Sequence, residues 1–357
     1  MRYYAPGRKR ARETHGDGRD MSLDARQLHA ESLVIDGLNA GGPHKEWLPL
    51  LKKAGVDATV STIGWMQGTR GTFQDIAFLM DRIDESPNEL LLATAAAQVE
   101  EARHAGKTAV IMCSQNTRLI EDEVSLLDSF QAVGMRIVQL TYNEANLVGD
   151  GCTEPRNAGL TDFGRAVVKR LNRLGIIPDG SHTGKQTTMD AMALTETPFI
   201  FTHANAKAVS NSRRNIDDEQ IEACAKTGGV VGVNAFSAFV KAEDPASASF
   251  DDFLNHIDHM VKVAGINHVG IGLDQTETRR WYTDRGVGND PNRSEDRRER
   301  VAPKHTYPVY SYVPGLESIT GMPLVTEGLV RRGYKAPDIA KILGLNWLRV
   351  YRQVWGA

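Results

Sequence analysis

The chain has 357 residues, of which 41% are hydrophobic and 24% charged, an ordinary composition for a globular protein of one large or two smaller domains. The formal net charge of -3 argues against a nucleic-acid partner or a membrane-surface role. The three cysteines are odd in number and far apart, which favours a reducing, cytoplasmic compartment over a disulfide framework. No stretch approaches the roughly 18 apolar residues of a membrane-spanning helix.

The first residues, MRYYAPGRKRARETHGDGRD, are polar, basic and rich in Gly and Arg. We predict that residues 1–22 form a disordered tail and that residues 23–357 form one domain. The RKRAR run could bind nucleic acid, but a disordered tail or an over-extended start ahead of Met21 explains the same composition.

Short runs rich in Val and Ile recur from residue 33 onward, without strict alternation of apolar and polar residues. Strands that are covered on both faces of a parallel sheet have this pattern. The predicted strands span residues 33–37, 58–64, 108–114, 136–142, 175–181, 198–203, 229–236 and 268–274.

Amphipathic segments separate these strands. The segment 160–175 has apolar residues at helical spacing, with Thr161 as N-cap and Gly175 as the C-terminal stop. Residues 251–265 show the same helical spacing, and a last helix is predicted over residues 346–355.

Eight strands with helices between them predict an α/β fold, a single-domain (β/α)8 TIM barrel. We expect the helix 346–355 to pack across the outside of the barrel. A doubly wound sheet is the alternative, but it would need a Gly-rich phosphate turn after an early strand, and the sequence has none. The charged, aperiodic stretch 276–315 follows the eighth strand and predicts a long loop over the barrel mouth.

Polar side chains follow several predicted strands at their carboxyl ends, which converge on one pocket in a barrel. His182 follows the fifth strand, His203 ends the sixth, and Asp274 ends the eighth. Imidazole nitrogen and carboxylate oxygen suit Zn²⁺, so this set predicts a zinc site. A single histidine at a strand end is more often a hydrogen-bonded structural residue, but two on neighbouring strands favour function. The other candidates, on an outer helix or at the opposite barrel end, are predicted to be structural: His256, His259 and His268.

The stretches LTDFGRAVVKRLNRLGIIPDGSHTGKQTTMDAM, PFIFTHANAKAVSNSRRNIDDE, HIDHMVKVAGINHVGIGLD and ILGLNWLRV resemble the membrane (renal) dipeptidase family, peptidase family M19, among the amidohydrolase-type metal barrels. The resemblance runs from about residue 28 to 355, with the motifs in family order. It implies a binuclear zinc enzyme that hydrolyses dipeptides with a free C-terminal carboxylate. It also implies a homodimer, with contacts expected from Trp281, Tyr307 and Tyr310 of the long loop.

The sequence departs from the family pattern at one of the two metal positions. The family's first strand ends in D-G-H-N-D, but Leu38 and Ala40 replace the two ligands here. The bridging glutamate corresponds to Gln115, and the histidine after the fourth strand corresponds to Tyr142. An uncharged Gln115 suits one cation, because fewer positive charges need neutralising. A divergent bacterial branch of the family resembles this pattern.

The resemblance also implies roles for residues that are retained. His182 and His203 correspond to the ligands of the other zinc, Asp274 to the proton-handling carboxylate, and Arg214 to the group that holds the substrate carboxylate. One half of a two-metal site is therefore missing, and the other half is present.

We expect a dipeptidase-like, metal-dependent hydrolase that acts on a small amide or modified dipeptide with a free carboxylate. It would use one zinc ion, with none as the alternative, and the expected residues are His182, His203 and Gln115 for the metal, Asp274 and Tyr142 for catalysis, and Arg214, Asn143 and Asn234 for substrate. A non-hydrolytic enzyme, such as an isomerase, lyase or decarboxylase of an amino-acid-like carboxylate, is the alternative. A binding protein without catalysis is the third possibility.

Overall fold

The computed structural model describes residues 19–40, 47–275 and 312–356. The helix α1 (Arg19–Glu31) begins inside the predicted tail, so the predicted boundary at residue 22 falls within a helix. Residues 1–18 and most of the predicted loop 276–315 lie outside the described residues. The proposed dimer contacts Trp281, Tyr307 and Tyr310 fall in that part as well.

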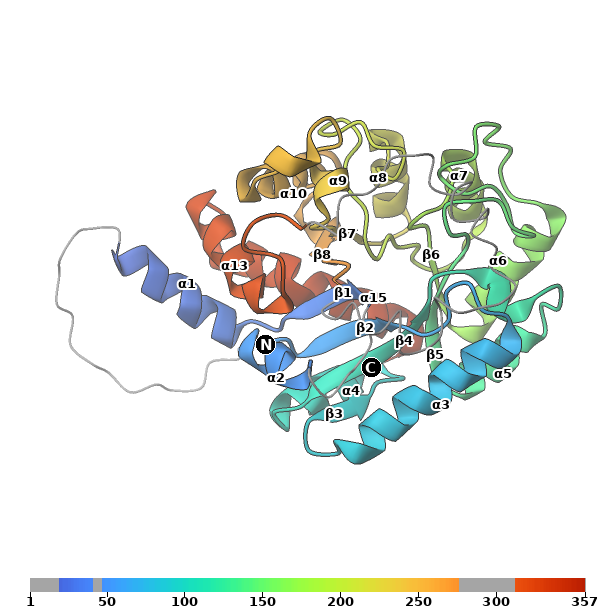
Figure 1. Ribbon diagram of the computed structural model, residues 1–357, viewed down its shortest axis with the longest axis horizontal. Coiled ribbons are helices and arrows are strands. Elements are labelled where there is room, and N and C mark those ends of the chain that lie inside the picture. Colours follow the sequence, from blue (N-terminus) through green and yellow to red (C-terminus); the bar gives the residue numbers. More distant parts are fainter. Residues whose placement is uncertain (1–18, 41–46, 276–311, 357) are drawn as a thin grey trace.

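Parallel strands form the centre of the molecule (Figure 1). The strands are β1 (Ile35–Asn39), β2 (Ala58–Thr62), β3 (Leu90–Leu92), β4 (Thr108–Ser114), β5 (Met135–Gln139), β6 (Ile177–Asp179), β7 (Val231–Val233) and β8 (Val269–Ile271). One sheet has the order β1-β2-β4-β5-β6, and β7 pairs with β8 in a second. Isolated parallel bridges join the two sheets: Ile200 pairs with Asp179, Phe201 with Val231, and Asn39 with Gln275. These pairings close the barrel that the sequence predicts.

Two segments differ from the predicted strands. Residues 198–203 pair on both sides but only through single bridges, because Ile200 faces β6 while Phe201 faces β7. The strand β3 was not predicted, since its Leu- and Ala-rich surroundings favour a helix. It pairs with the first residues of β4, whereas β5 pairs with the last residues of β4.

Helices cover the strands, and capping residues in the sequence explain where α6 begins and ends. The helix bounds are α2 (Leu48–Lys53), α3 (Thr69–Glu85), α4 (Ala96–His104), α5 (Leu126–Ala132), α6 (Asp162–Leu174), α7 (Lys185–Leu194), α8 (Asp218–Lys226), α9 (Ser237–Val240), α10 (Phe250–Ala264), α13 (Met322–Arg331), α14 (Ala336–Ala340) and α15 (Asn346–Trp355). In α6 the Thr161 hydroxyl accepts from the backbone N–H of Gly164, and Gly175 ends the helix at φ 64°. Both predicted ends of this helix are confirmed. Among the described residues, no helix combines the length and apolar character that a membrane crossing requires.

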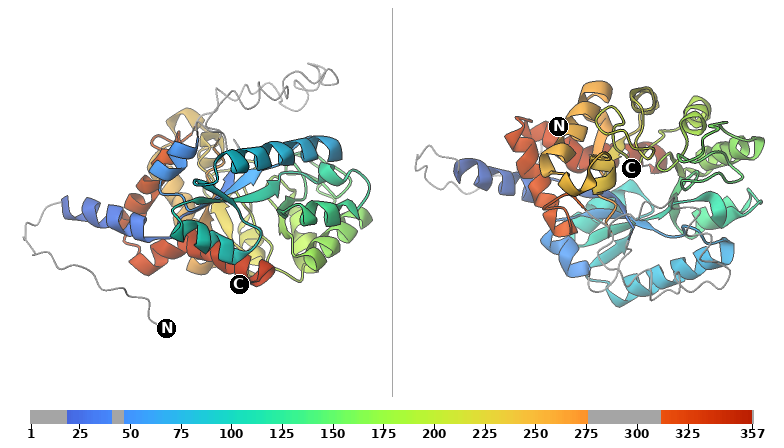
Figure 2. Two further views of the ribbon diagram at one scale, coloured as in Figure 1. Left: turned by 90° about the horizontal axis from the view of Figure 1, so that it is seen from below. Right: turned by 45° about the horizontal axis from the view of Figure 1, so that its top comes forward.

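The C-terminal helix α15 is placed differently from the prediction. Its buried residues do not belong to the core cluster that contains the buried residues of α3. They pack in a second cluster, together with α4 and with alternate residues of the strands. The Trp347 ring lies against β1, β7 and β8, and its Nε1–H donates to the carbonyl of Ile271 at 3.2 Å. A Cβ on Gly37 or Gly270 would stand 2.6 Å or 2.5 Å from the Trp347 ring. Glycine at these positions therefore lets the indole enter between the strands, and Figure 2 shows α15 and α4 on the same side of the sheet.

Candidate active site

The side chains expected in the site project from the carboxyl ends of the strands. His182 lies three residues after β6, Asn143 lies four residues after β5, and Asp274 lies three residues after β8. All three have left-handed backbones, with φ of 61°, 60° and 59°. A non-glycine residue rarely adopts this conformation, and such residues collect at functional sites. The backbone thus turns sharply at each strand end, at positions that carry polar side chains.

The two histidines of the predicted metal site face one another. Nε2 of His182 lies 2.9 Å from Nε2 of His203. On the far side of each ring, Nδ1 of His182 lies 2.7 Å from Oδ1 of Asn143, and Nδ1 of His203 lies 2.8 Å from Oγ1 of Thr202. Burial lowers the pKa of both histidines well below the usual value, and the nearby charge of Arg214 lowers it further. Both rings are therefore neutral at pH 7, the state that a metal ligand requires.

The histidine pair offers two donor nitrogens for a metal ion. Zn–N distances of about 2.0–2.1 Å in tetrahedral sites hold two imidazole nitrogens roughly 3.3 Å apart, so a small opening of the His182–His203 pair would admit an ion. In the part of the chain that the structure describes, no cluster of three His, Cys, Asp or Glu side chains could hold a metal. Leu38 and Ala40, at the family's first metal position, are buried and apolar. The two-ion centre implied by the resemblance therefore lacks ligands.

Arg214 lies against this histidine pair and is 6% exposed. Its Nη2 donates to the backbone carbonyl of His203 at 2.8 Å, and the guanidinium lies 5.5 Å from the centroid of Phe239. Its Nε has no hydrogen-bond partner among the described residues. A buried, unsatisfied guanidinium N–H is costly, and a carboxylate would satisfy it.

The carboxylate of Asp274 is held by Asn234, whose Nδ2 donates to Oδ2 at 3.0 Å. Burial raises the pKa of Asp274 to about 6, although the charge of Arg214 and the bond from Asn234 act in the opposite direction. Oδ1 of Asn234 accepts from the backbone N–H of Phe236 at 2.6 Å. The Asn234 carboxamide is thus engaged on both ends, and its predicted role in substrate binding stays a prediction.

Aromatic rings cover one side of the pair. The Tyr142 ring stacks on His182 with centroids 4.0 Å apart, and Trp65 meets the edge of Tyr142 at 5.2 Å. This stacking limits rotation of the His182 ring. Tyr142 therefore lies beside the predicted metal ligands, where the sequence placed it.

Gln115 lies at the end of β4, buried and 4% exposed. Its Nε2 donates to Oγ1 of Thr62 at 2.7 Å, and its backbone carbonyl accepts from Gln139 at 2.6 Å. The side-chain nitrogen of Gln115 is thus bonded to Thr62 of β2. The side-chain oxygen is the only atom of this amide that could bind a metal ion. The predicted role of Gln115 as a ligand stays a prediction.

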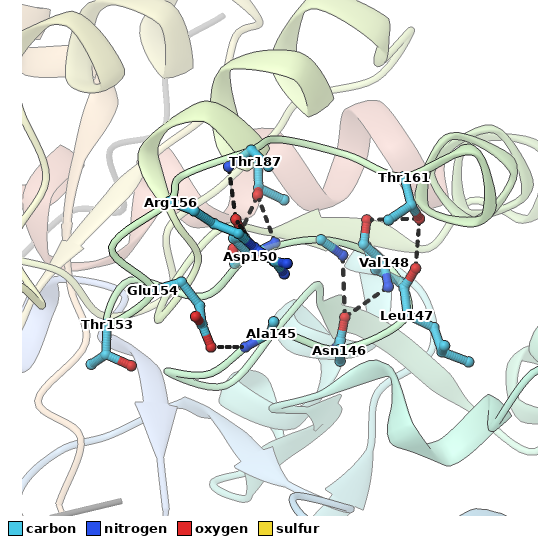
Figure 3. A network of polar contacts seen from close by, with 12 residues as sticks. Ala145, Asn146, Leu147, Val148, Asp150, Thr153, Glu154, Arg156, Thr161 and Thr187 are labelled. Carbon is cyan, nitrogen blue, oxygen red and sulfur yellow. Dashed lines mark hydrogen bonds and ion pairs between the residues drawn. The ribbon is translucent and has the colours of Figure 1, made fainter.

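The loop after β5, residues 143–160, is held by polar contacts of its own (Figure 3). Arg156 donates from Nε and Nη2 to the buried carboxylate of Asp150, with a closest distance of 2.6 Å. Oδ2 of Asp150 also accepts from the backbone N–H of Ala158 at 2.7 Å. The Thr187 hydroxyl of α7 donates to the Asp150 carbonyl at 3.0 Å. These contacts hold the loop in one conformation at the side of the site.

The same loop packs directly on Asn143. A Cβ on Gly151 would stand 2.1 Å from the Asn143 carbonyl oxygen, so only glycine fits. The next residue, Cys152, donates from its backbone N–H to the His182 carbonyl at 2.9 Å and from Sγ to Oδ1 of Asn143 at 3.5 Å. The amide oxygen of Asn143 is thus shared by His182 and Cys152, and the predicted contact of Asn143 with substrate stays a prediction.

Sequence reasoning missed residues behind the histidines. Asp179 ends β6 and is fully buried, and Thr202 precedes His203. Oδ2 of Asp179 accepts from the Thr202 hydroxyl at 2.5 Å. The sequence did indicate a role for Asp179. It places a carboxylate within an apolar strand, and a buried charge needs hydrogen-bond partners.

The sequence model of the membrane dipeptidase family, peptidase family M19, matches residues 48–280. The chain belongs to this family. Dipeptidase tcpJ of Claviceps purpurea (strain 20.1) is 27% identical over 287 residues, which cover 80% of this chain and 60% of that protein. The chain thus spans about 60% of the length of this curated relative.

Solved structures share the fold of this chain. An amidohydrolase from Pseudomonas aeruginosa is 30% identical, with a TM-score of 0.83 over 93% of this chain and 99% of that chain. A metallo peptidase from Rhodobacter sphaeroides, liganded with a phosphinate mimic of the dipeptide L-Ala-D-Ala, is 21% identical. Its TM-score is 0.75 over 91% of this chain and 100% of that chain, so it supports the fold. The family and fold that the resemblance implies are therefore confirmed.

Proposed function

We propose that this protein is a metal-dependent hydrolase of a small amide or modified dipeptide that carries a free carboxylate. One observation carries the proposal: a buried arginine with an unsatisfied Nε lies beside two converging imidazoles and a carboxylate whose pKa is raised to about 6. The first group fits a substrate carboxylate, the second a cation, and the third accepts a proton near neutral pH.

Each side chain has a task in this proposal. Arg214 binds the substrate carboxylate, so that the scissile bond is held near His182 and His203. Asp274 takes a proton from the attacking water, since its pKa is close to the working pH. Tyr142, stacked on His182, donates a hydrogen bond to the oxygen on which negative charge develops.

A single zinc ion is the cofactor in this proposal, held by His182 and His203 with Gln115 as the third candidate. When bound, zinc lowers the pKa of a ligated water toward about 7. The buried, apolar Leu38 and Ala40 at the family's other metal position support one ion over two. A homodimer and a cytoplasmic location stay predictions, which light scattering and cell fractionation would test.

A non-hydrolytic enzyme is the second candidate, since Tyr142 and Asp274 form an acid and a base beside Arg214. This candidate is favoured by the small number of protein ligands around the histidine pair. It needs no zinc, so elemental analysis of the purified protein separates the two candidates.

The test uses protein loaded with one equivalent of zinc and a panel of dipeptides and N-acylated amino acids. Each compound is supplied with a free C-terminal carboxylate and as the matching C-terminal amide. We expect hydrolysis of at least one free acid, no hydrolysis of its amide, and loss of activity in His203→Ala. Equal turnover of both forms, or zinc-independent turnover, would contradict the proposal.

A further inference from the structure

Behind the histidine pair, a chain of hydrogen bonds leads from a buried carboxylate to the metal-facing nitrogen. Oδ1 of Asp179 accepts two backbone N–H groups, from Ser181 at 2.8 Å and from Thr202 at 3.1 Å. Oδ2 of Asp179 accepts from the Thr202 hydroxyl at 2.5 Å. Oγ1 of Thr202 then lies 2.8 Å from Nδ1 of His203, whose Nε2 faces His182.

The number of hydrogens fixes the direction of this chain. A hydroxyl has one hydrogen, and Oγ1 of Thr202 has three polar neighbours: Oδ2 of Asp179 at 2.5 Å, Nδ1 of His203 at 2.8 Å and Oγ of Ser181 at 3.2 Å. The ionised carboxylate is the nearest and strongest acceptor of the three, so the hydrogen is directed at Asp179. Oγ1 of Thr202 can therefore only accept from Nδ1 of His203, so the hydrogen of the neutral imidazole lies on Nδ1. The consequence is that Nε2 of His203 carries a free lone pair, directed into the site.

We propose that Asp179 and Thr202 are positioning residues that hold His203 as the Nδ1–H tautomer and so keep Nε2 ready to bind a cation. The proposal rests on the proposed function for the identity of the ligand, but the tautomer is a property of the protein alone. Outer partners of this kind orient metal-binding histidines and fix their tautomer.

Asn143 has the corresponding place behind His182. Its Oδ1 lies 2.7 Å from Nδ1 of His182, and an amide oxygen can only accept. The two imidazoles thus have acceptors on their outer nitrogens, and their inner nitrogens meet at 2.9 Å. Two facing lone pairs at this distance repel, so either a hydrogen on one inner nitrogen or a cation must lie between them.

The Asp179→Asn substitution gives a sharp test, because the surrounding amides dictate how the new side chain sits. The two backbone N–H groups of Ser181 and Thr202 need an acceptor, so the amide oxygen takes the place of Oδ1. The amide NH2 then takes the place of Oδ2 and donates to Oγ1 of Thr202. The hydroxyl then donates to Nδ1 of His203 at 2.8 Å in preference to the more distant Oγ of Ser181 at 3.2 Å, and the imidazole hydrogen moves to Nε2.

The tautomer is measured in metal-free, full-length protein by long-range ¹H–¹⁵N correlation of ¹⁵N-labelled histidine, with His203 assigned from the His203→Asn variant. We expect Nδ1–H in the wild type and Nε2–H in Asp179→Asn. Thr202→Val should lose the single preference, and Thr202→Ser should restore it. Thr183→Val is the matched control, because its hydroxyl bonds to Thr141 and not to an imidazole.

Zinc affinity, measured by titration against a competing chelator, is the second readout. Asp179→Asn and Thr202→Val should each bind zinc about 10–100-fold more weakly than wild type, and Thr202→Ser and Thr183→Val should be unchanged. Circular dichroism and thermal melting confirm that each variant is folded.

The outcomes separate the two proposals. An Nε2–H tautomer of His203 in the wild type, as a protonated Asp179 would produce, overturns the inference whatever the zinc content. The expected tautomers in a protein that binds no zinc would instead leave the positioning role intact and contradict the zinc-dependent proposed function. Unchanged tautomers in Asp179→Asn would show that the carboxylate does not act on His203.

Discussion

Asn234 Nδ2 donates to Oδ2 of Asp274 at 3.0 Å, and this hydrogen bond opposes the effect of burial on the same carboxylate. Burial is the larger effect, so the pKa of Asp274 is raised to about 6. The carboxylate is therefore mostly ionised at pH 7 and protonated at pH 5. A base in this state loses activity over a narrow range of acidic pH.

We predict that kcat/KM falls as the pH drops through about 6, the pKa of Asp274. Asn234→Ala removes a donor to the ionised form, so the pKa should rise and the acidic limb of the profile should move to higher pH. The measurement is kcat/KM from pH 4.5 to 8 on the substrate found above. Asn267→Ala, an exposed asparagine at the other end of the barrel, is the control. A limb that stays in place in Asn234→Ala would exclude Asp274 as the titrating group.

Arg214→Ala should weaken binding of carboxylate ligands by about 10–100-fold, since a hydrogen bond to a charged group is worth roughly 1.5–3 kcal/mol. Arg214→Lys should give an intermediate loss, because it keeps the charge without the two-pronged guanidinium. Calorimetric titration with a substrate analogue measures the affinity. The same analogue as a C-terminal amide is the control, and its affinity should not change. Equal losses for acid and amide would show that Arg214 supports the fold and not the carboxylate.

Leu38→His, Ala40→Asp and Gln115→Glu together should raise bound zinc from about one to about two equivalents, because they return imidazole and carboxylate donors to one place. Elemental analysis of dialysed protein measures the content. Leu38→Phe with Ala40→Asn is a control of similar size that adds no charged or imidazole ligand, and it should stay at about one. A triple variant that is folded but still holds one equivalent would show that these positions do not converge.

Trp347→Ala should lower the free energy of unfolding by about 3–5 kcal/mol, because it leaves a cavity where a fully buried indole lay. Trp355→Ala, at the partly exposed end of α15, should have a smaller effect. Chemical denaturation with a two-state analysis measures both. Equal losses at the two positions would contradict the placement of Trp347 between the strands.

The barrel itself was predictable because β-branched runs and turn residues repeat along the chain, and local patterns of that kind are set by neighbours in sequence. The interior position of α15 was not predictable in this way. Its amphipathic pattern predicts that one face of the helix is buried, but not which residues cover that face. The glycines that contact Trp347, such as Gly37 and Gly270, are distant in sequence. A one-residue strand pairing such as that of Ile200 likewise has no periodicity to detect.

The same difference holds for the site. His182, His203 and Asp274 were predictable as polar residues at strand ends, where a barrel brings side chains together. Their partners were harder to predict, because Asn143 and Asn234 resemble substrate-binding amides in the sequence. Only the fold shows that these carboxamides bind His182 and Asp274.

The left-handed backbones of Asn143, His182 and Asp274 lower the stability of the fold at residues that the proposed activity needs. Glycine adopts such a conformation freely, whereas other residues pay about 1 kcal/mol or more for it. A library screened for thermal resistance alone would therefore favour glycine at His182 and Asp274, and it would enrich well-folded but inactive variants. Screens for more robust forms should hold these positions fixed and look for gains elsewhere in the barrel.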